Sequence, residues 1–204
     1  MALLATALTA TSAVFSNDLT YVPGMAPRSA NQSALVAGGM QVLPREDAET
    51  LSLCKRMMEQ GPLLVVFNPV EGFMVEADRH IKDLTIITEY VGEVDYLRNC
   101  EHDDGDSMMT LLSAEPPSKS LVICLDKRSN IARFINGINN HTPEGRKKQN
   151  LKCVRFAIDG ESIVSWWPTG TSPRGRDCCH VSVGYAVPNT CETIRSMRLV
   201  GMEP

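Results

Sequence analysis

The chain has 204 residues, of which 43% are hydrophobic and 22% are charged. This length and composition predict one globular domain that builds its own core, and they exclude both a small disulfide scaffold and a disordered tail. The formal net charge of -4 excludes a protein that grips DNA phosphates through bulk positive charge.

Seven cysteines are scattered along the chain, an odd number with no CxxC pair among them. Neither a disulfide framework nor a zinc finger is indicated, so we predict no metal site and take a reducing compartment as the default. The cysteines are Cys54, Cys100, Cys124, Cys153, Cys178, Cys179 and Cys191.

Residues 1–43 are predicted to form a disordered leader and linker. The first fifteen residues are apolar or hydroxylated, lack the Lys or Arg that opens a signal peptide, and are too few to span a bilayer. A plastid-type transit segment is the second interpretation, although no Arg precedes Arg28. Proline and glycine then recur between residues 21 and 40, which is typical of an irregular linker.

Acidic residues near Glu46 and basic residues near Lys55 predict a helix over residues 44–61, because these charges oppose those of the helix ends. Short apolar or β-branched runs bounded by turn residues predict strands in the body of the chain, residues 62–162. The predicted strands are residues 63–67, 73–77, 85–91, 108–112, 121–125 and 152–158. The body is therefore expected to be mostly β.

Two acidic segments are candidates for function. EYVGE, residues 89–93, ends a predicted strand with carboxylates around a tyrosine, as a strand leaving a core also does. The acidic loop at residues 101–106 could steer a basic peptide by long-range attraction, with a solvated turn as the ordinary alternative. Its spacing lacks the twelve-position pattern of a calcium loop.

A third candidate is residues 133–141, RFINGINNH, where amides follow an aromatic residue. Amides are expensive to bury unless each finds a partner, and a ligand with an amine, a carboxylate and a purine edge supplies several. An Asn-rich turn is the alternative. The basic residues 146–148 that follow are interpreted as a solubilising surface.

These segments, together with QNLKCVRF and DGDSMMTLL, closely resemble the SET domain of the plant Trithorax-related enzymes that monomethylate lysine 27 of histone H3. The resemblance covers about residues 19–162. It implies a mostly β SET-domain (β-clip) fold with short helices, one leading helix and an irregular C-terminal tail. Residues 44–61 would then be a pre-SET helix, and residues 62–162 the SET domain body.

The resemblance also implies the reactants. The cofactor would be S-adenosyl-L-methionine, and the partner would be the N-terminal tail of histone H3, with no direct nucleic-acid or membrane partner. The activity would be a histone-lysine N-methyltransferase acting in chromatin silencing. The nucleus is the implied location, beside the plastid alternative.

Cofactor-binding residues follow from the same resemblance. Asn140 and His141 would contact the amino-acid and adenine parts of the cofactor, largely through backbone and amide hydrogen bonds. Arg133 and Phe134 would shape the same wall. The segment Gly72, Phe73 and Met74 would stand where other SET domains place a glycine-rich cofactor contact, although the usual Gly-aromatic-Gly is incomplete here.

Tyr90 is the implied catalytic residue, beside the channel for the substrate lysine. Met108, Asp106 and Asn136 are the implied substrate-binding residues. The negative net charge is consistent with a basic histone tail as substrate.

Residues 163–204 are predicted to form an atypical tail, because the family's closing segment with paired tyrosines has no counterpart in them. Reading one base earlier across residues 166–179 permits the family-like sequence LVANRDISKGKRLL. We therefore hypothesise that a frame change or a misjoined exon replaced the C-terminus near residue 163. The alternative function is a catalytically impaired SET fragment that binds cofactor or histone tail without turnover.

Overall fold

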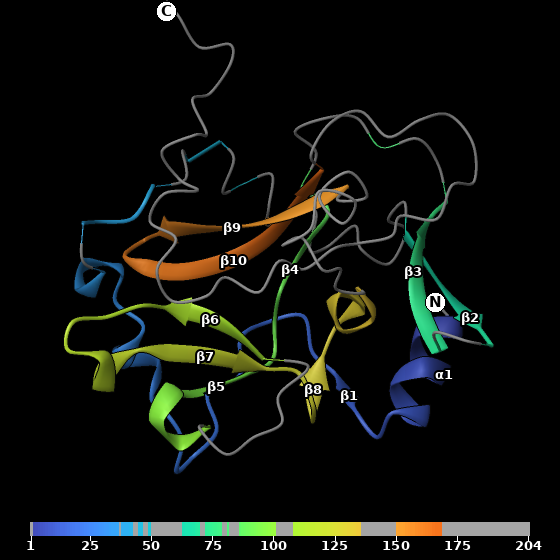
Figure 1. The fold of residues 1–204 in the computed structure, drawn as a ribbon, viewed down its shortest axis with the longest axis horizontal. Coiled ribbons are helices and arrows are strands. Elements are labelled where there is room, and N and C mark those ends of the chain that lie inside the picture. The colour runs from blue at the N-terminus through green and yellow to red at the C-terminus, as the bar shows by residue number, and fades with distance from the viewer. Residues whose placement is uncertain are drawn as a thin grey trace, which may run out of the picture.

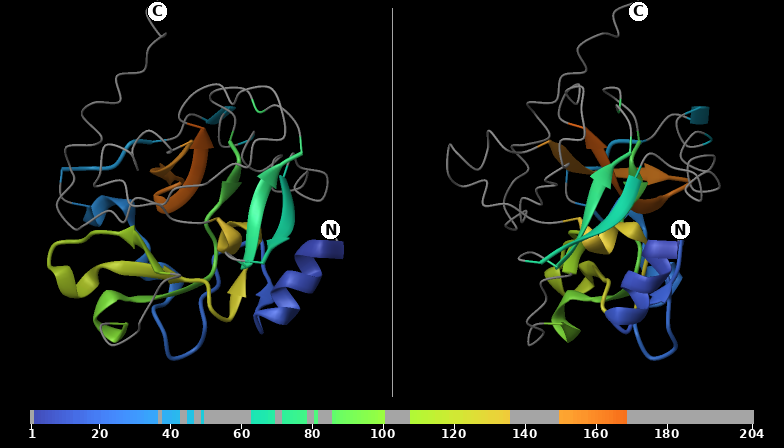
Figure 2. Two further views of the ribbon diagram at one scale, coloured as in Figure 1. Left: turned by 45° about the vertical axis from the view of Figure 1, so that its right-hand side comes forward. Right: turned by 90° about the vertical axis from the view of Figure 1, so that its right-hand side faces the viewer.

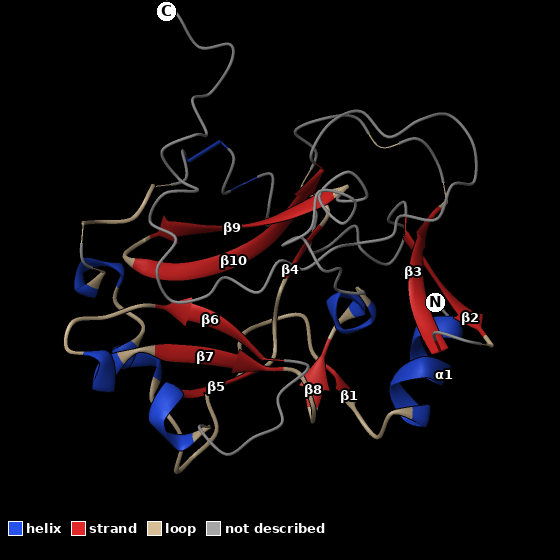
Figure 3. Cartoon of the chain, in the orientation of Figure 1, coloured by secondary structure: helices blue, strands red, loops and turns tan. Residues whose placement is uncertain are grey.

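The computed structural model describes residues 2–36, 38–42, 45–46, 49, 63–69, 72–78, 81, 86–100, 108–135 and 150–168. Strands predominate in these ranges, with one helix, α1 (Ala2–Ala10), and short 3-10 turns (Figures 1 and 3). The 3-10 turns are η1 (Arg28–Ala30), η2 (Ser33–Leu35), η4 (Leu97–Asn99), η5 (Pro117–Lys119) and η6 (Ile131–Phe134). The strands are β1 (Val14–Phe15), β2 (Leu63–Asn68), β3 (Gly72–Ala77), β4 (Thr88–Glu89), β5 (Glu93–Tyr96), β6 (Met108–Leu112), β7 (Leu121–Cys124), β8 (Arg128–Ser129), β9 (Leu151–Ile158) and β10 (Glu161–Pro168).

The strands form four small sheets. β2 and β3 make an antiparallel hairpin, while β5–β7–β6 and β4–β10–β9 are three-stranded antiparallel sheets. β1 lies parallel to β8. Figure 1 shows the two three-stranded sheets one above the other, with the β2–β3 hairpin to one side. The prediction of a mostly β chain is confirmed.

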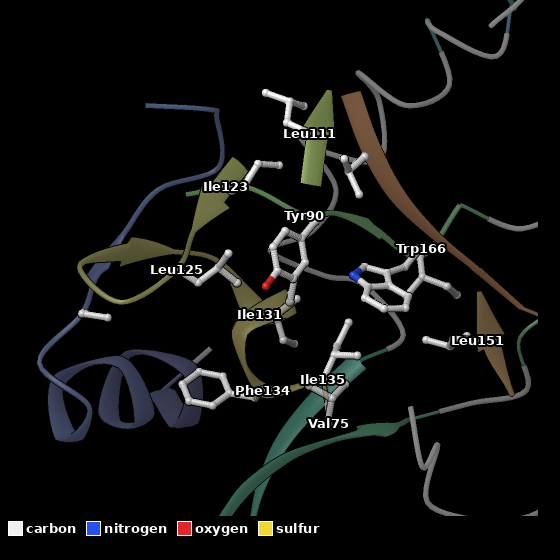
Figure 4. Packing of buried hydrophobic residues seen from close by; sticks show 14 of the residues in the cluster. Val75, Tyr90, Leu111, Ile123, Leu125, Ile131, Phe134, Ile135, Leu151 and Trp166 are labelled. Carbon is white, nitrogen blue, oxygen red and sulfur yellow. The ribbon is translucent and has the colours of Figure 1, made fainter. Parts of the chain in front are cut away.

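One apolar cluster draws on the two three-stranded sheets and the β2–β3 hairpin and fills the space between them (Figure 4). Its largest fully buried side chains come from β3, β5, β6, β7 and β10 and from the loops that follow them. Burying such a side chain stabilises the fold by about 1.5–3 kcal/mol relative to leaving it exposed. They include Trp166, Leu111, Leu112, Leu121, Ile123, Leu125, Val75 and Val94.

Five of the predicted strands match β2, β3, β6, β7 and β9 closely. The predicted strand at residues 85–91 is shorter in the structure, because β4 is confined to Thr88–Glu89. β5 was not predicted, since it begins and continues with acidic residues. Its Asp95 is nonetheless buried, and one carboxylate oxygen accepts hydrogen bonds from the Ala26 and Tyr96 amides and from Asn99.

The prediction that residues 1–43 are disordered is wrong for residues 2–36. α1 packs against β2, as Figure 2 shows, and buries Ala7 and Leu8 in the core. Downstream of β1, Thr20 bridges Glu93 of β5, and Val36 bridges Ala114. These backbone pairings satisfy the polar groups of a segment that has few regular elements of its own.

The leader is also tied to β10 by a buried side chain. Asn31 accepts a hydrogen bond from the Ser162 amide at 3.0 Å and donates one to the Ser162 carbonyl at 2.9 Å. Asn31 also donates to the hydroxyl of Tyr21, whose pKa is raised chiefly by burial. A flexible linker would leave these groups to water, so the linker is a structural part of the domain.

The predicted helix at residues 44–61 lies almost entirely outside the described residues. Within it, residues 45, 46 and 49 are helical, and Arg45 pairs with Glu49 at 3.2 Å, one turn later. Both side chains of this pair are exposed, so it adds only about 0.3–0.5 kcal/mol.

The predicted tail begins inside a strand of the core. β10 runs from Glu161 to Pro168, pairs with β9 along its whole length, and pairs with β4 through Ser165 and Trp166. Trp166 is fully buried. A boundary at residue 163 is therefore wrong as a structural boundary, because apolar residues up to Pro168 continue the sheet. Residues 169–204 lie outside the described residues.

Candidate active site

An aromatic row connects the β2–β3 hairpin to η6. The Phe73 ring of β3 lies between two others, with centroids 5.3 Å from Phe67 and 5.8 Å from Phe134. Both pairs are edge-to-face, the arrangement that aromatic quadrupoles favour. Phe134 ends η6 and is buried, so the row brings two predicted cofactor-binding segments together.

Asn130 fixes the start of η6. Its carboxamide oxygen accepts a hydrogen bond from the Ala132 amide at 2.9 Å, which caps the turn. Its carboxamide nitrogen donates to the Glu89 carbonyl at 2.9 Å and lies 3.3 Å from the Thr88 hydroxyl. Asn130 is fully buried. One side chain therefore holds η6 against β4, the strand that leads to Tyr90.

Tyr90 follows β4 directly and lies inside the core. Its backbone amide donates a hydrogen bond to the Val164 carbonyl of β10 at 2.8 Å, and this bond fixes the position of Tyr90 relative to β10. Its ring centroid lies 6.3 Å from that of Trp166, at an interplanar angle of 59°. Figure 4 shows the Tyr90 ring within the cluster, with Trp166 on one side, Leu125 on the other and Ile131 below.

Arg133 anchors the other end of η6. Its guanidinium donates to the Leu125 carbonyl and lies 3.8 Å from a carboxylate oxygen of Asp126. The arginine side chain is largely buried, whereas Asp126 is about half exposed. The guanidinium is thus engaged by the residues that follow β7. η6 is consequently held by Asn130 at its start and by Arg133 near its end.

These elements match known proteins. The chain is 71% identical to histone-lysine N-methyltransferase ATXR6 of Arabidopsis thaliana over 168 residues, which is 80% of this chain and 48% of the relative. It is 58% identical to ATXR5 of the same plant over 188 residues, 91% of this chain and 50% of the relative. No family model matches the chain.

The solved structures agree. A crystal structure of ATXR5 in complex with histone H3.1 superimposes with a TM-score of 0.81 at 60% identity, and the match covers 86% of this chain and 83% of that one. The chain belongs to the plant ATXR5/ATXR6 family of SET-domain histone-lysine methyltransferases. The predicted SET fold is confirmed. Membership of this methyltransferase family implies S-adenosyl-L-methionine as cofactor, and the chain spans about half the length of the curated relatives it matches.

Within this SET domain, the three residues Gly72, Phe73 and Met74 of β3 differ in conformation and burial. Gly72 has a φ of +79° and open space where a Cβ would stand, so its backbone conformation is what favours glycine. Met74 is buried, whereas Phe73 is partly exposed beside Phe134. Met108 lies elsewhere, on β6 opposite Cys124 of β7. The structure thus joins the β3 segment to η6 but places Met108 in a different sheet.

Four predicted site residues lie outside the described residues: Asp106, Asn136, Asn140 and His141. In the described part of the chain, no group of three or more His, Cys, Asp or Glu side chains could hold a metal ion. Over the same ranges, no helix has the length and apolar character needed to cross a membrane.

Two positions that the sequence analysis did not single out fix the backbone on either side of Tyr90. Asn130 precedes the turn-forming run IARF, a position typical of a helix N-cap, and that signal could have identified it. Gly92 was quoted within EYVGE without a role. A Cβ on Gly92 would stand 2.3 Å from the Cys124 carbonyl oxygen, so close backbone approach requires glycine there.

Proposed function

We propose that this chain transfers a methyl group from S-adenosyl-L-methionine to a lysine of the histone H3 tail, with monomethylation of lysine 27 as the specific reaction and chromatin silencing as its role. The observation that carries the proposal is the likeness, at 60% identity over 83% of its chain, to ATXR5 in complex with histone H3.1. We also propose the nucleus as its location. A fluorescent fusion in plant cells distinguishes the nucleus from a plastid.

The described residues fit an adenosyl ligand. Phe73 is partly exposed and offers aromatic surface for a purine, with the buried Phe134 packed behind it, and Gly72 leaves open space beside its α-carbon. The carboxamide oxygen of Asn150 is buried and has no donor among the described residues. We propose that it accepts a hydrogen bond from one of the ligand's amino groups, which are donors. We assign cofactor binding to the Gly72–Phe73 segment, Phe134 and Asn150, together with Asn140 and His141.

The contributions of Arg133 and Met74 are constrained by their contacts. The Arg133 guanidinium is engaged by Leu125 and Asp126, so we propose that Arg133 acts on the cofactor through its backbone and through the position of η6. Met74 is buried, so it supports the β3 wall by packing. Phe134 of η6 packs its ring edge-to-face against Phe73 of the β3 segment.

The chemistry requires placement and exclusion of water. When bound, the cofactor supplies a methyl group on a positively charged sulfur. We assign Tyr90 to the channel that surrounds the substrate amine, with Met108, Asp106 and Asn136 on the substrate side. A dry channel lowers the pKa of a lysine from its reference value of about 10.4, because burial and a nearby positive charge both disfavour the ammonium form. Orienting the neutral amine in line then provides most of the acceleration.

The test combines two measurements on the full chain. Calorimetry measures S-adenosyl-L-methionine binding, and a radiolabelled methyl assay measures transfer to an H3 tail peptide, with a peptide carrying arginine in place of lysine 27 as the matched control. Binding with lysine-dependent transfer supports the proposal. Binding without transfer indicates the impaired fragment, and a folded chain that does not bind the cofactor contradicts the site.

A further inference from the structure

Two thiols lie close together beside the end of β7, in the β5–β7–β6 sheet. Cys100 follows η4 and Cys124 ends β7, and their sulfur atoms are 3.9 Å apart. Cys100 is buried, whereas Cys124 is partly exposed. We propose that this pair is a site of reversible oxidation, at which a peroxide converts the two thiols into a disulfide. The proposal concerns a modification of the chain and does not rest on the proposed methyl transfer.

The surrounding backbone allows the bond to form. A disulfide has a sulfur–sulfur distance of about 2.05 Å, so the two atoms must approach by about 1.9 Å. Cys124 is held in the middle strand of its sheet, opposite Glu93 on one side and Met108 on the other. Cys100 caps a single 3-10 turn, where its amide bonds the Leu97 carbonyl. The smaller element can supply the movement, by side-chain rotation and a slight shift of the turn.

The reaction balances with a peroxide as the oxidant. The Cys124 thiolate attacks one peroxide oxygen, the O–O bond breaks, and the products are a sulfenic acid and hydroxide, which takes up the thiol proton as water. The Cys100 sulfur then attacks the sulfenic sulfur, the S–S bond forms, and a second water leaves with the Cys100 proton. The two sulfurs lose two electrons and the peroxide gains them. A dithiol reductant reverses the change by exchange.

Cys153 provides an internal comparison. Its sulfur lies 3.1 Å from the thioether sulfur of Met109, which cannot form a disulfide. Burial also raises the pKa of the Cys153 thiol to about 12, so it carries almost no thiolate near neutral pH. The described cysteines thus divide into a pair placed for oxidation and one thiol protected from it.

The position of the pair gives the modification a consequence. Cys100 directly precedes residues 101–107, and Met108 directly follows them. Met108 is the register partner of Cys124, and Cys100 contacts Cys124, so both ends of this segment meet at one residue. A Cys100–Cys124 disulfide would therefore attach the first end of this segment covalently to β7, the strand that already pairs with its second end. Because it closes a loop in the unfolded chain, it should raise the midpoint of thermal unfolding by about 10 °C.

Peptide mapping tests the proposal. The reduced full chain is treated with hydrogen peroxide, remaining thiols are alkylated, and proteolytic fragments are analysed by mass spectrometry with and without dithiothreitol. We expect a linked pair of fragments containing Cys100 and Cys124, lighter by two hydrogen atoms than the separate thiols and released by dithiothreitol. Cys100→Ser and Cys124→Ser should each abolish the linked pair, whereas Cys153→Ser should retain it.

A denatured sample separates geometry from general reactivity. In guanidinium chloride, the seven cysteines lose their native neighbours, so the Cys100–Cys124 pair should lose its preference over other pairings. Two results would overturn the proposal: the same pairing pattern in native and denatured chains, or native Cys124 oxidised to sulfinic acid with Cys100 still a thiol. Neither readout depends on methyl transfer, so failure here is distinguishable from failure of the proposed function.

Discussion

The Asn31 side chain completes the backbone hydrogen bonds of Ser162, 131 positions later in the chain, by donating to its carbonyl and accepting from its amide. Both residues are fully buried, and the Ser162 hydroxyl donates in turn to the Leu111 carbonyl at 2.7 Å. The leader is thereby joined to the sheet that carries Trp166, which packs against Tyr90.

Asn31→Ala should destabilise the domain by about 2–4 kcal/mol, because it removes two hydrogen bonds and leaves a buried amide and carbonyl without partners. Urea unfolding monitored by tryptophan fluorescence measures the change. Gln32→Ala is the matched control, since Gln32 is exposed and should shift stability by less than about 0.5 kcal/mol. Equal effects at the two positions would show that the Asn31 contacts contribute nothing specific.

Gly92→Ala should destabilise by about 3 kcal/mol or more, since the new Cβ would lie 2.3 Å from the Cys124 carbonyl oxygen and one strand would have to move. Gly24→Ala is the comparison. Gly24 has a φ of +92° but open space around it, so backbone strain alone predicts about 1–2 kcal/mol. Thermal melts of the two variants separate the steric clash from backbone strain. If Gly92→Ala lowered the melting temperature less than Gly24→Ala does, the predicted clash with Cys124 would be wrong.

Asn130→Ala should cost about 2–3 kcal/mol, because the capping hydrogen bond of η6 and the bond to the Glu89 carbonyl are both lost. Asn130→Asp keeps the capping acceptor but loses the donor, so we expect it to restore little stability. Asn99→Ala removes an exposed amide that donates to Asp95 and serves as control. Full rescue by aspartate in denaturant unfolding would assign the whole effect to capping and none to the contact with β4.

The raised pKa of the Cys153 thiol should make the free energy of unfolding fall at alkaline pH. Its thiol pKa is raised from 9.0 to about 12 in the folded chain, chiefly by burial, so the folded state holds the proton more tightly than the unfolded state. The stabilisation is fully present below pH 9 and is lost as the pH rises toward 12, with a slope of up to about 1.4 kcal/mol per pH unit. Unfolding curves of wild type and Cys153→Ala between these values should diverge in slope, and parallel curves would exclude the effect.

Asn140→Ala tests the proposed cofactor site. Losing an amide that bonds a charged ligand should weaken S-adenosyl-L-methionine binding by about ten-fold or more, while the thermal melt stays within about 2 °C of wild type. Calorimetry measures the affinity, and Asn99→Ala should leave it unchanged. An unaltered affinity in Asn140→Ala would remove this residue from the site.

Local patterns were sufficient for much of the fold. β2, β3, β6, β7 and β9 were predicted because each is a short apolar or β-branched run between turn residues. α1 and β5 were missed for opposite reasons. The α1 sequence is rich in Ala and Leu and packs on β2, while β5 is acidic and is stabilised by donors from distant segments.

Some residues of the candidate site could likewise be predicted from local sequence, whereas others could not. The segments around Tyr90 and Phe134 were identified from their residues and from the family resemblance, and the comparisons confirm that family. Asn130 was missed because its importance lies in reaching the Glu89 carbonyl, 41 positions earlier. The neighbouring residues, RSNIARF, do not indicate the hydrogen bond between Asn130 and the Glu89 carbonyl.

By itself, the sequence determined the family and the type of most elements, because motifs and hydrophobic patterns are local properties of the chain. The tertiary structure alone decided that the leader belongs to the domain, that residues up to Pro168 continue the sheet, and that Cys100 meets Cys124. Each of these depends on which distant polar group or sulfur lies within bonding distance. That distance is set by how the sheets pack.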